Sequence, residues 1–301
     1  MPAPKKASLD ETSRKTTSKA DRIKRIGVIA GGGSLPLRLL EVCDDKNIES
    51  FVIGFDGQTD PLTVKDRNHM WTRIGAAGQI IKTLKAHEIK DLVLIGSIRR
   101  PTLMELRPDI KTAEFFARVS IKALGDNSLL TALRHELEED GFTIHGIHEF
   151  AQDLLTGEGV MGKIKPGKEQ MVDLERAIEI SQTLGHLDVG QSVVVQQGIV
   201  LGVEAAEGTD QLIARCKHLK RKGRGGVLVK TCKPQQDRDF DLPTIGPHTV
   251  RLAADAGLSG IAVHAGHSIV IEPVEVARLA DKHKLFVTGI VLPDFKTKSK
   301  P

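Results

Sequence analysis

Ile26-Gly27-Val28-Ile29-Ala30-Gly31-Gly32-Gly33-Ser34-Leu35-Pro36 passes from a short apolar run directly into three consecutive glycines. A run of about five apolar residues that ends in glycine is typical of a buried strand followed by a turn. The residues that follow, 36–46, have the pattern expected of a helix. The stretch therefore predicts a strand-loop-helix unit, the building block of an α/β fold.

The same alternation continues through the first half of the chain. Further strands are expected at residues 51–55, 91–96 and 142–146, and further helices at 77–87 and 127–140. Apolar runs that alternate with helical patterns indicate βα units on a parallel sheet. We therefore predict an N-terminal domain with a Rossmann-like parallel sheet.

The second half differs in its strand pattern. Gln196-Gln197-Gly198 lies between apolar runs at 192–195 and 199–203, which is the signature of an antiparallel hairpin. The remaining expected elements are helices at 169–184, 210–220, 247–256 and 275–284, and strands at 226–230, 260–263, 268–271 and 286–291. These elements predict a second α/β domain with a mixed sheet.

A length of 301 residues exceeds what one hydrophobic core usually supports, so two domains are expected. Residues 156–168 are rich in Gly and Lys without periodicity, which favours an inter-domain connection near residue 157. The predicted organisation is a disordered basic extension (1–25), an N-terminal α/β domain (26–156), a C-terminal α/β catalytic domain (157–293) and a tail (294–301), with the ligand between the domains.

The charge distribution argues against nucleic acid as a partner. The net charge is +4, but residues 1–25 hold eight Lys and Arg against three acidic residues, so the rest of the chain has no basic excess. Aromatic residues make up 3% and Tyr is absent, which leaves few platforms for base stacking. The basic extension is expected to be a solvated tail, with a tether to an anionic surface as the alternative.

The sequence predicts a cytoplasmic protein. Its three cysteines have no CxxC spacing, which suits a reducing compartment. The N-terminus lacks the apolar stretch of a secretory signal, and no run of about 18 apolar residues offers a transmembrane segment.

The glycine loop is the first candidate site. The bare backbone amides of Gly31, Gly32, Gly33 and Ser34 can approach an anion such as a phosphate closely. A dinucleotide cofactor is not expected, because Pro36 occupies the place of the last glycine in the G-x-G-x-x-G pattern. The alternative is a tight strand-to-helix turn with no ligand.

A second candidate follows the hairpin, at residues 204–210. Here a strand end passes through Glu207, Gly208 and Thr209 into a helix, and Thr209 can cap the unpaired first-turn amides. Such a helix end suits a ligand rich in oxygen. A plain helix cap is the alternative, although it gives no reason for Glu207 and Gly208.

The third candidate is the long polar loop at residues 230–246. Asp237, Asp239 and Asp241 alternate along it, so an extended chain would direct three carboxylates the same way. That arrangement is costly unless a cation or a lysine neutralises it, and oxygen ligands alone favour Mg²⁺ or Mn²⁺ over zinc. A solvated acidic edge is the alternative.

Histidine pairs do not predict a zinc site. His264 and His267, and likewise His145 and His148, are three residues apart. Residues at that spacing face opposite sides of a strand, so neither pair is expected to bring two imidazoles together.

Taken together, these stretches resemble the UDP-2,3-diacylglucosamine diphosphatases of the I type. The similarity runs over residues 26–290 and is strongest at 29–36, 187–191, 203–210 and 233–246. The resemblance implies two α/β domains, a divalent metal (Mg²⁺ or Mn²⁺), and hydrolysis of UDP-2,3-diacylglucosamine to 2,3-diacylglucosamine 1-phosphate (lipid X) and UMP in lipid A biosynthesis.

The resemblance implies that the family's essential aspartate is Asp241, and the chemistry of the three candidate loops predicts the other site residues. Asp241 is the expected catalytic residue, Asp241 and Asp237 are the expected metal ligands, and Lys233 is expected on a phosphate. In the family a basic residue can stand at the position of Asp239. The expected substrate-binding residues are Gly31, Gly32, Gly33, Ser34, Leu35, Glu207, Gly208, Thr209, Lys233, Gln236, Thr244 and Gly246.

Several alternatives stay open at this point. The chain could be a hydrolase of another UDP-sugar, or a catalytically silent protein that senses a nucleotide-linked lipid. Contact with the inner membrane surface and assembly into a homo-oligomer are also left open.

Overall fold

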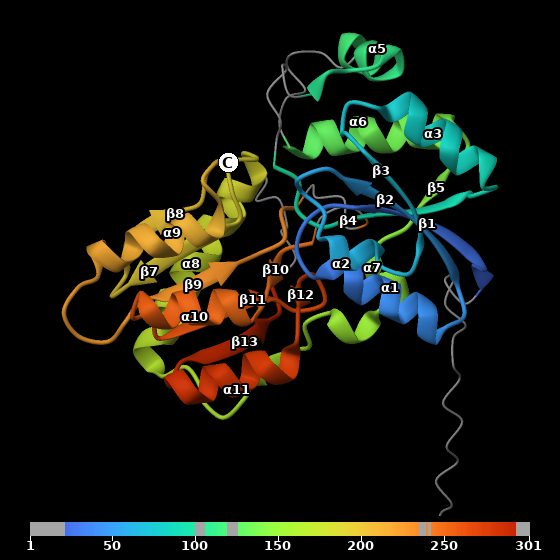
Figure 1. Cartoon of the computed structure of the whole chain (residues 1–301). Helices are drawn as coiled ribbons and strands as arrows, with labels where there is room; N and C mark the ends of the chain where they lie inside the picture. Colours follow the sequence, from blue (N-terminus) through green and yellow to red (C-terminus); the bar gives the residue numbers. More distant parts are fainter. Residues whose placement is uncertain (1–21, 100–105, 119–125, 235–238, 240–241, 293–301) are drawn as a thin grey trace, which may run out of the picture.

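The computed structural model describes residues 22–99, 106–118, 126–234, 239 and 242–292. It contains two α/β domains side by side, which confirms the predicted fold class (Figure 1). The N-terminal sheet has the order β3-β2-β1-β4-β5, and every neighbouring pair is parallel. Its strands are β1 (Arg25–Ala30), β2 (Glu49–Phe55), β3 (Asn68–Thr72), β4 (Asp91–Ile95) and β5 (Thr143–Ile144).

Helices cover both faces of this sheet, because its strands are apolar on both sides. On β1, Val28 packs with α1 and α7, whereas Ile29 packs with α3 and α6 on the opposite face. The helices of the domain are α1 (Leu35–Asp45), α2 (Pro61–Val64), α3 (Ala77–Ala86), α5 (Ile110–Arg118), α6 (Asp126–Glu139) and α7 (Ile147–Phe150), with a 3-10 turn at Gln152–Leu154.

The C-terminal sheet is mixed, as the sequence predicts. Its order is β6-β13-β11-β9-β7-β8; β9, β11 and β13 are parallel, and the other pairs are antiparallel. Its strands are β6 (Gly159–Met161), β7 (Ser192–Gln196), β8 (Ile199–Val203), β9 (Val227–Lys230), β11 (Gly260–His264) and β13 (Phe286–Ile290).

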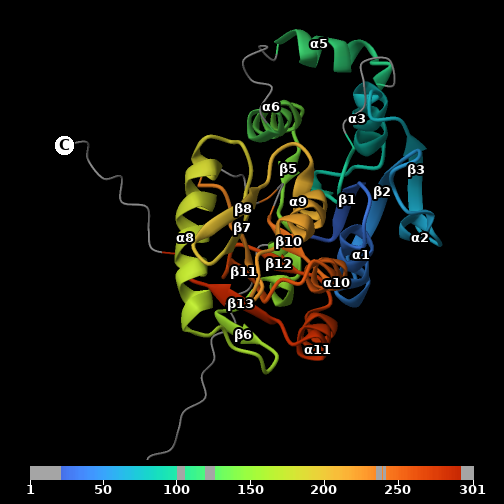
Figure 2. The same cartoon turned by 90° about the vertical axis from the view of Figure 1, so that its left-hand side faces the viewer.

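A single long helix covers one face of this sheet and three helices cover the other (Figure 2). Leu174 and Ala177 of the long helix α8 pack on Val193, Val229 and Phe286. The helices are α8 (Lys168–His186), α9 (Gly208–Cys216), α10 (Pro247–Asp255) and α11 (Pro273–His283), with a 3-10 turn at Lys217–Leu219.

A two-stranded parallel sheet links the cores of the two domains. It is formed by β10 (Thr244–Ile245) and β12 (Ile269–Val270). Ile245 is buried in the C-terminal core, whereas Leu242 and Ile269 are buried in the N-terminal core against α1 and α7. Leu242 and β10, at the end of the polar loop, thereby lie at the domain junction.

Several elements differ from the sequence-based expectation. The strand expected at 142–146 covers only Thr143–Ile144, because Gly146 is the N-cap of α7. The segment expected at 268–271 pairs with β10 and not with the main sheet. Residues 156–168, expected to be a connection, contain β6, which pairs with β13. Across the described part of the chain, no helix is both long and apolar enough to span a bilayer.

Candidate active site between the two domains

A cavity of about 310 Å³ lies where the two domains meet. It opens at the carboxyl ends of β1 and β4, where the strand order reverses, which is where ligands bind in open α/β sheets. The N-terminal domain contributes Gly32, Gly33, Ser34, Leu35, Leu94, Ile95, Gly96, Ser97 and Ile147. The C-terminal domain contributes Gln191, Lys230, Asp239, Leu242, Thr244, Ile269 and Ile271.

The first two glycines of the loop are required by packing. The amide of Gly31 donates to the carbonyl oxygen of Ile95 at 2.8 Å, and the amide of Gly32 donates to that of Ser97 at 2.7 Å. A Cβ at Gly31 would lie 2.6 Å from the carbonyl oxygen of Ser97, so a side chain cannot fit there. For these two residues the structure supports the tight-turn interpretation, since their amides are already occupied.

The next three residues have free amides that can bind an anion. Gly33 has a φ of 88°, which favours glycine, and a Cβ there would meet nothing within 4 Å. Among the described residues, the amides of Gly33, Ser34 and Leu35 have no hydrogen-bond acceptor, and no side chain caps the start of α1. All three residues line the cavity, where the positive end of the α1 dipole favours an anion.

Lys230 is the cation of the C-terminal wall, and we did not predict it. It ends β9, its side chain lines the cavity, and the residue is 9% exposed. Its ammonium donates to Thr209 Oγ1 at 2.9 Å and to the carbonyl oxygen of Thr244 at 3.4 Å. A signal was available in the sequence, because a charged residue at the carboxyl end of a buried strand lies where ligands bind.

The structure explains why Glu207 and Gly208 stand at the start of α9. Glu207 is the N-cap, and its carboxylate accepts hydrogen bonds from Arg215 at 2.8 Å and from the amide of Ala205 at 3.1 Å. Hydrogen bonds from its own amide and from Arg215 lower the pKa of Glu207. Gly208 has a φ of 80°, which accounts for glycine at this position. The suggestion that Thr209 caps the helix was wrong, because the helix begins at Gly208 and its N-cap is Glu207.

Of the expected residues in this segment, only Thr209 touches a side chain that lines the cavity. Its hydroxyl lies between Lys230 and Glu204, donating to Glu204 Oε1 at 2.7 Å. Glu207 and Gly208 do not line the cavity. Their role in substrate binding stays a prediction.

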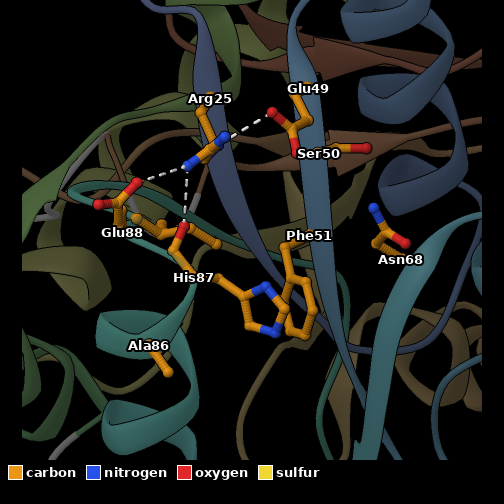
Figure 3. Close-up of a pocket in the computed structure, with 9 residues that line it drawn as sticks. Arg25, Glu49, Ser50, Phe51, Asn68, Ala86, His87 and Glu88 are labelled. Atoms are coloured by element: carbon orange, nitrogen blue, oxygen red, sulfur yellow. Dashed lines mark hydrogen bonds and ion pairs between the residues drawn. The ribbon is translucent and has the colours of Figure 1, made fainter.

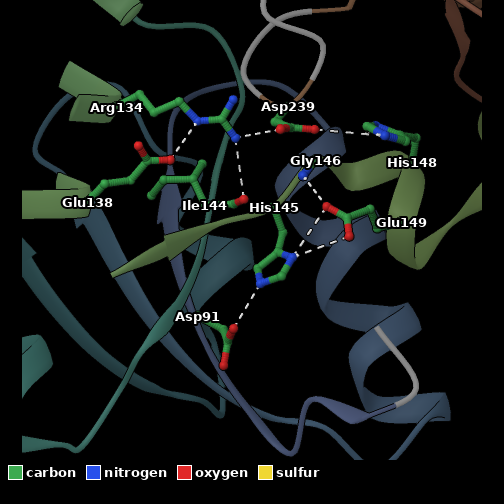
Figure 4. A network of polar contacts seen from close by, with 9 residues as sticks. All are labelled: Asp91, Arg134, Glu138, Ile144, His145, Gly146, His148, Glu149 and Asp239. Atoms are coloured by element: carbon green, nitrogen blue, oxygen red, sulfur yellow. Dashed lines mark hydrogen bonds and ion pairs between the residues drawn. The ribbon is translucent and has the colours of Figure 1, made fainter. Parts of the chain in front are cut away.

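The polar loop contributes one described aspartate to the cavity. Asp239 Oδ2 lies 2.5 Å from Arg134 Nη2 of α6, and Asp239 Oδ1 lies 3.8 Å from His148 Nε2 (Figure 4). A cation from the other domain therefore neutralises this carboxylate. Gln236, Asp237 and Asp241 lie outside the described residues, so their expected roles stay predictions.

His145 and His148 do not contact each other. His145 Nε2 lies 2.8 Å from Asp91 Oδ1, and His145 Nδ1 lies 3.3 Å from Glu149, whose carboxylate also accepts from the amide of Gly146 (Figure 4). This network ties β4 and β5 to the start of α7. His148 instead approaches Asp239.

The expectation for His264 and His267 was wrong. Their ring centroids are 4.2 Å apart, because β11 ends at His264 and the following turn brings His267 back over it. Strand alternation does not hold beyond His264, where the strand ends. Within the described ranges, no group of three His, Cys, Asp or Glu side chains could hold a metal ion.

Two further expected binding residues lie outside the cavity wall. Lys233 Nζ is 2.7 Å from Asp188 Oδ1 at the end of α8. Gly246 is the N-cap of α10. Thr244, in contrast, lines the cavity next to Lys230.

A second cavity, of about 290 Å³, lies at the amino ends of β1, β2 and β3 (Figure 3). Arg25 crosses it to Glu49 at 2.9 Å and to Glu88 at 3.4 Å. The ring of His87 lies 4.2 Å from that of Phe51. This end of a parallel sheet is opposite to the one where ligands bind, and its charged groups are paired, so the inter-domain cavity is the stronger candidate.

Comparison with solved structures gives only weak likeness. Glycinamide-RNase-transformylase T from Mycobacterium tuberculosis matches with a TM-score of 0.23 and 9% identity, over 60% of this chain and 44% of that one. The biotin carboxylase-beta-gamma-ATP complex from Campylobacter jejuni matches with a TM-score of 0.23 and 13% identity, over 67% and 43%. At TM-scores this low, the likeness assigns neither a fold family nor a function to this chain.

Comparison with family models and curated proteins is decisive. Residues 25–154 match the LpxI N-terminal domain and residues 157–288 match the LpxI C-terminal domain. "UDP-2,3-diacylglucosamine pyrophosphatase LpxI" of Caulobacter vibrioides (strain ATCC 19089 / CIP 103742 / CB 15) is 36% identical over 275 residues, which cover 89% of this chain and 98% of that protein. Two α/β domains around a shared cavity, both matched by their own models, show that this chain belongs to the LpxI family.

Proposed function

We propose that this chain hydrolyses the diphosphate of UDP-2,3-diacylglucosamine in lipid A biosynthesis, releasing 2,3-diacylglucosamine 1-phosphate and UMP. The name of the Caulobacter relative supports this substrate. The observation that carries the proposal is the cavity between the domains, where the free amides of residues 33–35 and the ammonium of Lys230 line the same space. Such a site suits a ligand with phosphate charges.

The chemistry of the substrate agrees with these groups. Cleavage of a diphosphate requires neutralisation of oxyanions and orientation of a water molecule. The amides at the start of α1 and Lys230 can supply the first requirement. A cavity of about 310 Å³ is at the small end of ligand sites, so it suits the diphosphate and a sugar and leaves the acyl chains to an adjoining surface.

Asp241 is our candidate for the catalytic carboxylate, and Asp241 with Asp237 for the ligands of Mg²⁺ or Mn²⁺. The role of Asp241 rests on the family resemblance of the loop at residues 230–246, and that of Asp237 rests on the alternation of carboxylates along the same loop. The described residues alone do not supply a metal-binding set. A bound divalent ion would stabilise phosphate charge and activate water.

The reaction is proposed to take place in the cytoplasm, and the substrate's acyl chains are the reason to propose transient contact with the inner membrane surface. Residues 233, 236, 207–209 and 246 remain proposed substrate contacts. Assembly into a homo-oligomer is likewise proposed.

The test is release of UMP from UDP-2,3-diacylglucosamine by the full chain, with Mg²⁺ or Mn²⁺ and with EDTA. We expect metal-dependent release that Asp241→Ala abolishes and that Asp255→Ala, an exposed aspartate on α10, leaves unchanged. Circular dichroism of both variants verifies the fold. Lipid binding without UMP release would identify a sensor, and turnover of a UDP-sugar without acyl chains would identify a different hydrolase.

A further inference from the structure

The two charged residues that line the inter-domain cavity differ in whether they have a partner of opposite charge among the described residues. These two residues are Lys230 and Asp239. Asp239 is paired with Arg134, whereas no ion pair among the described residues includes Lys230. Lys230 is therefore a nine-tenths buried ammonium whose partners among the described residues are two neutral oxygens, without the counter-charge that buried ions usually have there.

The neighbours of Lys230 hold its ammonium in one place. Thr209 donates its only hydroxyl proton to Glu204 Oε1, so the oxygen of Thr209 can only accept from Lys230. Glu204 Oε2 in turn accepts from the amide of Gln191 at 3.3 Å. The carboxylate of Glu204 therefore acts through Thr209 and does not reach the lysine in any contact that the structure describes.

Two of the three donors of Lys230 have acceptors in the described part of the chain. An ammonium has three N–H groups. Two of them are directed at Thr209 Oγ1 and at the carbonyl oxygen of Thr244. The third has no acceptor among the described residues, and the side chain lines the cavity whose other wall presents the free amides of residues 33–35.

We propose that Lys230 binds a phosphate oxygen of the nucleotide substrate, and that Thr209 and Glu204 position its ammonium for that contact. The phosphate supplies the missing counter-charge, and the amides of residues 33–35 hold the same phosphate or its neighbour from the opposite wall. The identity of the substrate rests on the proposed function. The binding of a phosphate by Lys230 is independent of the proposed function.

Binding of UMP and of inorganic pyrophosphate to the full chain, measured by isothermal titration calorimetry, tests this proposal. Lys230→Met should weaken binding by roughly 10- to 100-fold, the usual loss for a hydrogen bond to a charged group. Lys282→Met, at an exposed position of α11, is the matched control and should bind as the wild type does.

Stability separates a binding role from a structural one. Because Lys230→Met removes a buried charge that has no oppositely charged partner among the described residues, the variant should resist urea at least as well as the wild type. Thr209→Val should weaken binding less than Lys230→Met, and Thr209→Ser should restore it, since serine keeps the hydroxyl. These two variants keep the test valid should Lys230→Met fail to fold.

The outcomes distinguish this proposal from the proposed function. If the wild type binds UMP through Lys230 but releases none from the lipid substrate, the proposed function fails and the Lys230 assignment stands. If a folded Lys230→Met variant binds UMP and pyrophosphate as tightly as the wild type, the assignment is overturned, whatever the activity. Failure of the wild type to bind either ligand also overturns it.

Discussion

Arg134 of the N-terminal domain and Asp239 of the C-terminal domain form an ion pair at the edge of the inter-domain cavity, with 2.5 Å between Nη2 and Oδ2. Both side chains are about three-quarters buried, at 23% and 27% exposed. Arg134 is also held by Glu138 on its own helix, at 3.1 Å. The pair therefore fixes Asp239 against helix α6 of the other domain.

A double-mutant cycle measures what this ion pair contributes to activity. Arg134→Gln and Asp239→Asn should each lower kcat/KM for UMP release, and the double variant should lose less than the sum, because either change alone breaks the contact. We expect a coupling free energy of about 0.5–3 kcal/mol, the range for residues in contact. Kinetic constants of the four proteins give this value.

The matched control is Arg176 with Glu179, an ion pair of 2.8 Å on the surface of α8 with side chains 51% and 69% exposed. Its coupling should be near zero, because exposed pairs contribute little. A coupling at Arg134 and Asp239 no larger than this would show that the inter-domain contact has no part in catalysis.

The sequence predicted the regular parts of the fold well, since buried strands and amphipathic helices have clear apolar patterns. The helix expected at 36–46 is Leu35–Asp45, and the hairpin around residues 196–198 has the expected antiparallel pairing. Strand β3 was missed, because Asn68 and His69 are exposed at the edge of the sheet and interrupt the apolar pattern. β6 was missed because it is short and begins with a glycine.

The site could be predicted only in part, for a different physical reason. Local motifs identified the glycine loop and the polar loop, which depend on neighbouring residues in the chain. Lys230, Arg134 and Gln191 meet their partners across long sequence separations, which one sequence does not reveal. The distinction between Gly31, whose amide is occupied, and Gly33, whose amide is free, also required the position of Ser97 and Ile95.

Gly31 should be sensitive to any added side chain. A methyl group there would lie 2.6 Å from the carbonyl oxygen of Ser97 and 2.8 Å from the carbonyl carbon of Gly96, both backbone atoms that cannot rotate away. We expect Gly31→Ala to lower the free energy of unfolding by about 1–3 kcal/mol or more, the usual cost of overpacking. Urea titration followed by the fluorescence of Trp71, the single tryptophan, reports on this domain.

Gly57→Ala is the comparison for Gly31→Ala. Gly57 has a φ of 73° but open space around its Cβ position, so only backbone strain of about 1 kcal/mol is expected. Equal losses in the two variants would mean that close packing against Gly96 and Ser97 is not what requires glycine at position 31.

Asp140 should stabilise the N-terminal domain in a pH-dependent way. Burial raises the pKa of this carboxyl, but hydrogen bonds from Lys111 and Lys85 outweigh burial and lower the pKa below its usual value. The lysine ammonium groups lie 2.7 Å and 3.2 Å away. A carboxyl with a lowered pKa stabilises the fold above the pKa of the unfolded chain, about 3.9, and this contribution is lost as the pH falls through the folded pKa.

Asp140→Asn should therefore destabilise the domain by about 1 kcal/mol near neutral pH, and the difference from the wild type should shrink below about pH 4. Trp71 fluorescence in urea at several pH values gives both curves. A difference that stays constant down to about pH 3 would assign the effect of the substitution to lost packing and not to charge.

For Cys43 we predict the opposite pH dependence of stability, with a loss at alkaline pH. Its thiol is fully buried on α1, and burial, with a smaller contribution from Asp44, raises its pKa to about 11. In the unfolded chain a cysteine ionises near about pH 8.5. A group whose pKa is raised by folding stabilises the fold below the unfolded pKa, and that stability is lost as the pH rises towards the folded value. Ionisation of the unfolded chain should therefore lower the free energy of unfolding by about 1–2 kcal/mol at about pH 10.

Cys43→Ala removes this titration and leaves a small cavity whose cost does not depend on pH. The variant should be less stable than the wild type at about pH 7.5, and the two unfolding free energies should converge as the pH rises to about 10. Trp71 fluorescence in urea with a reducing agent measures both proteins, and it reports on the domain that contains Cys43. Unfolding free energies of the two proteins that stay a constant distance apart over this range would mean that the thiol also ionises in the folded protein near its ordinary pKa. Water would then reach the buried side of α1.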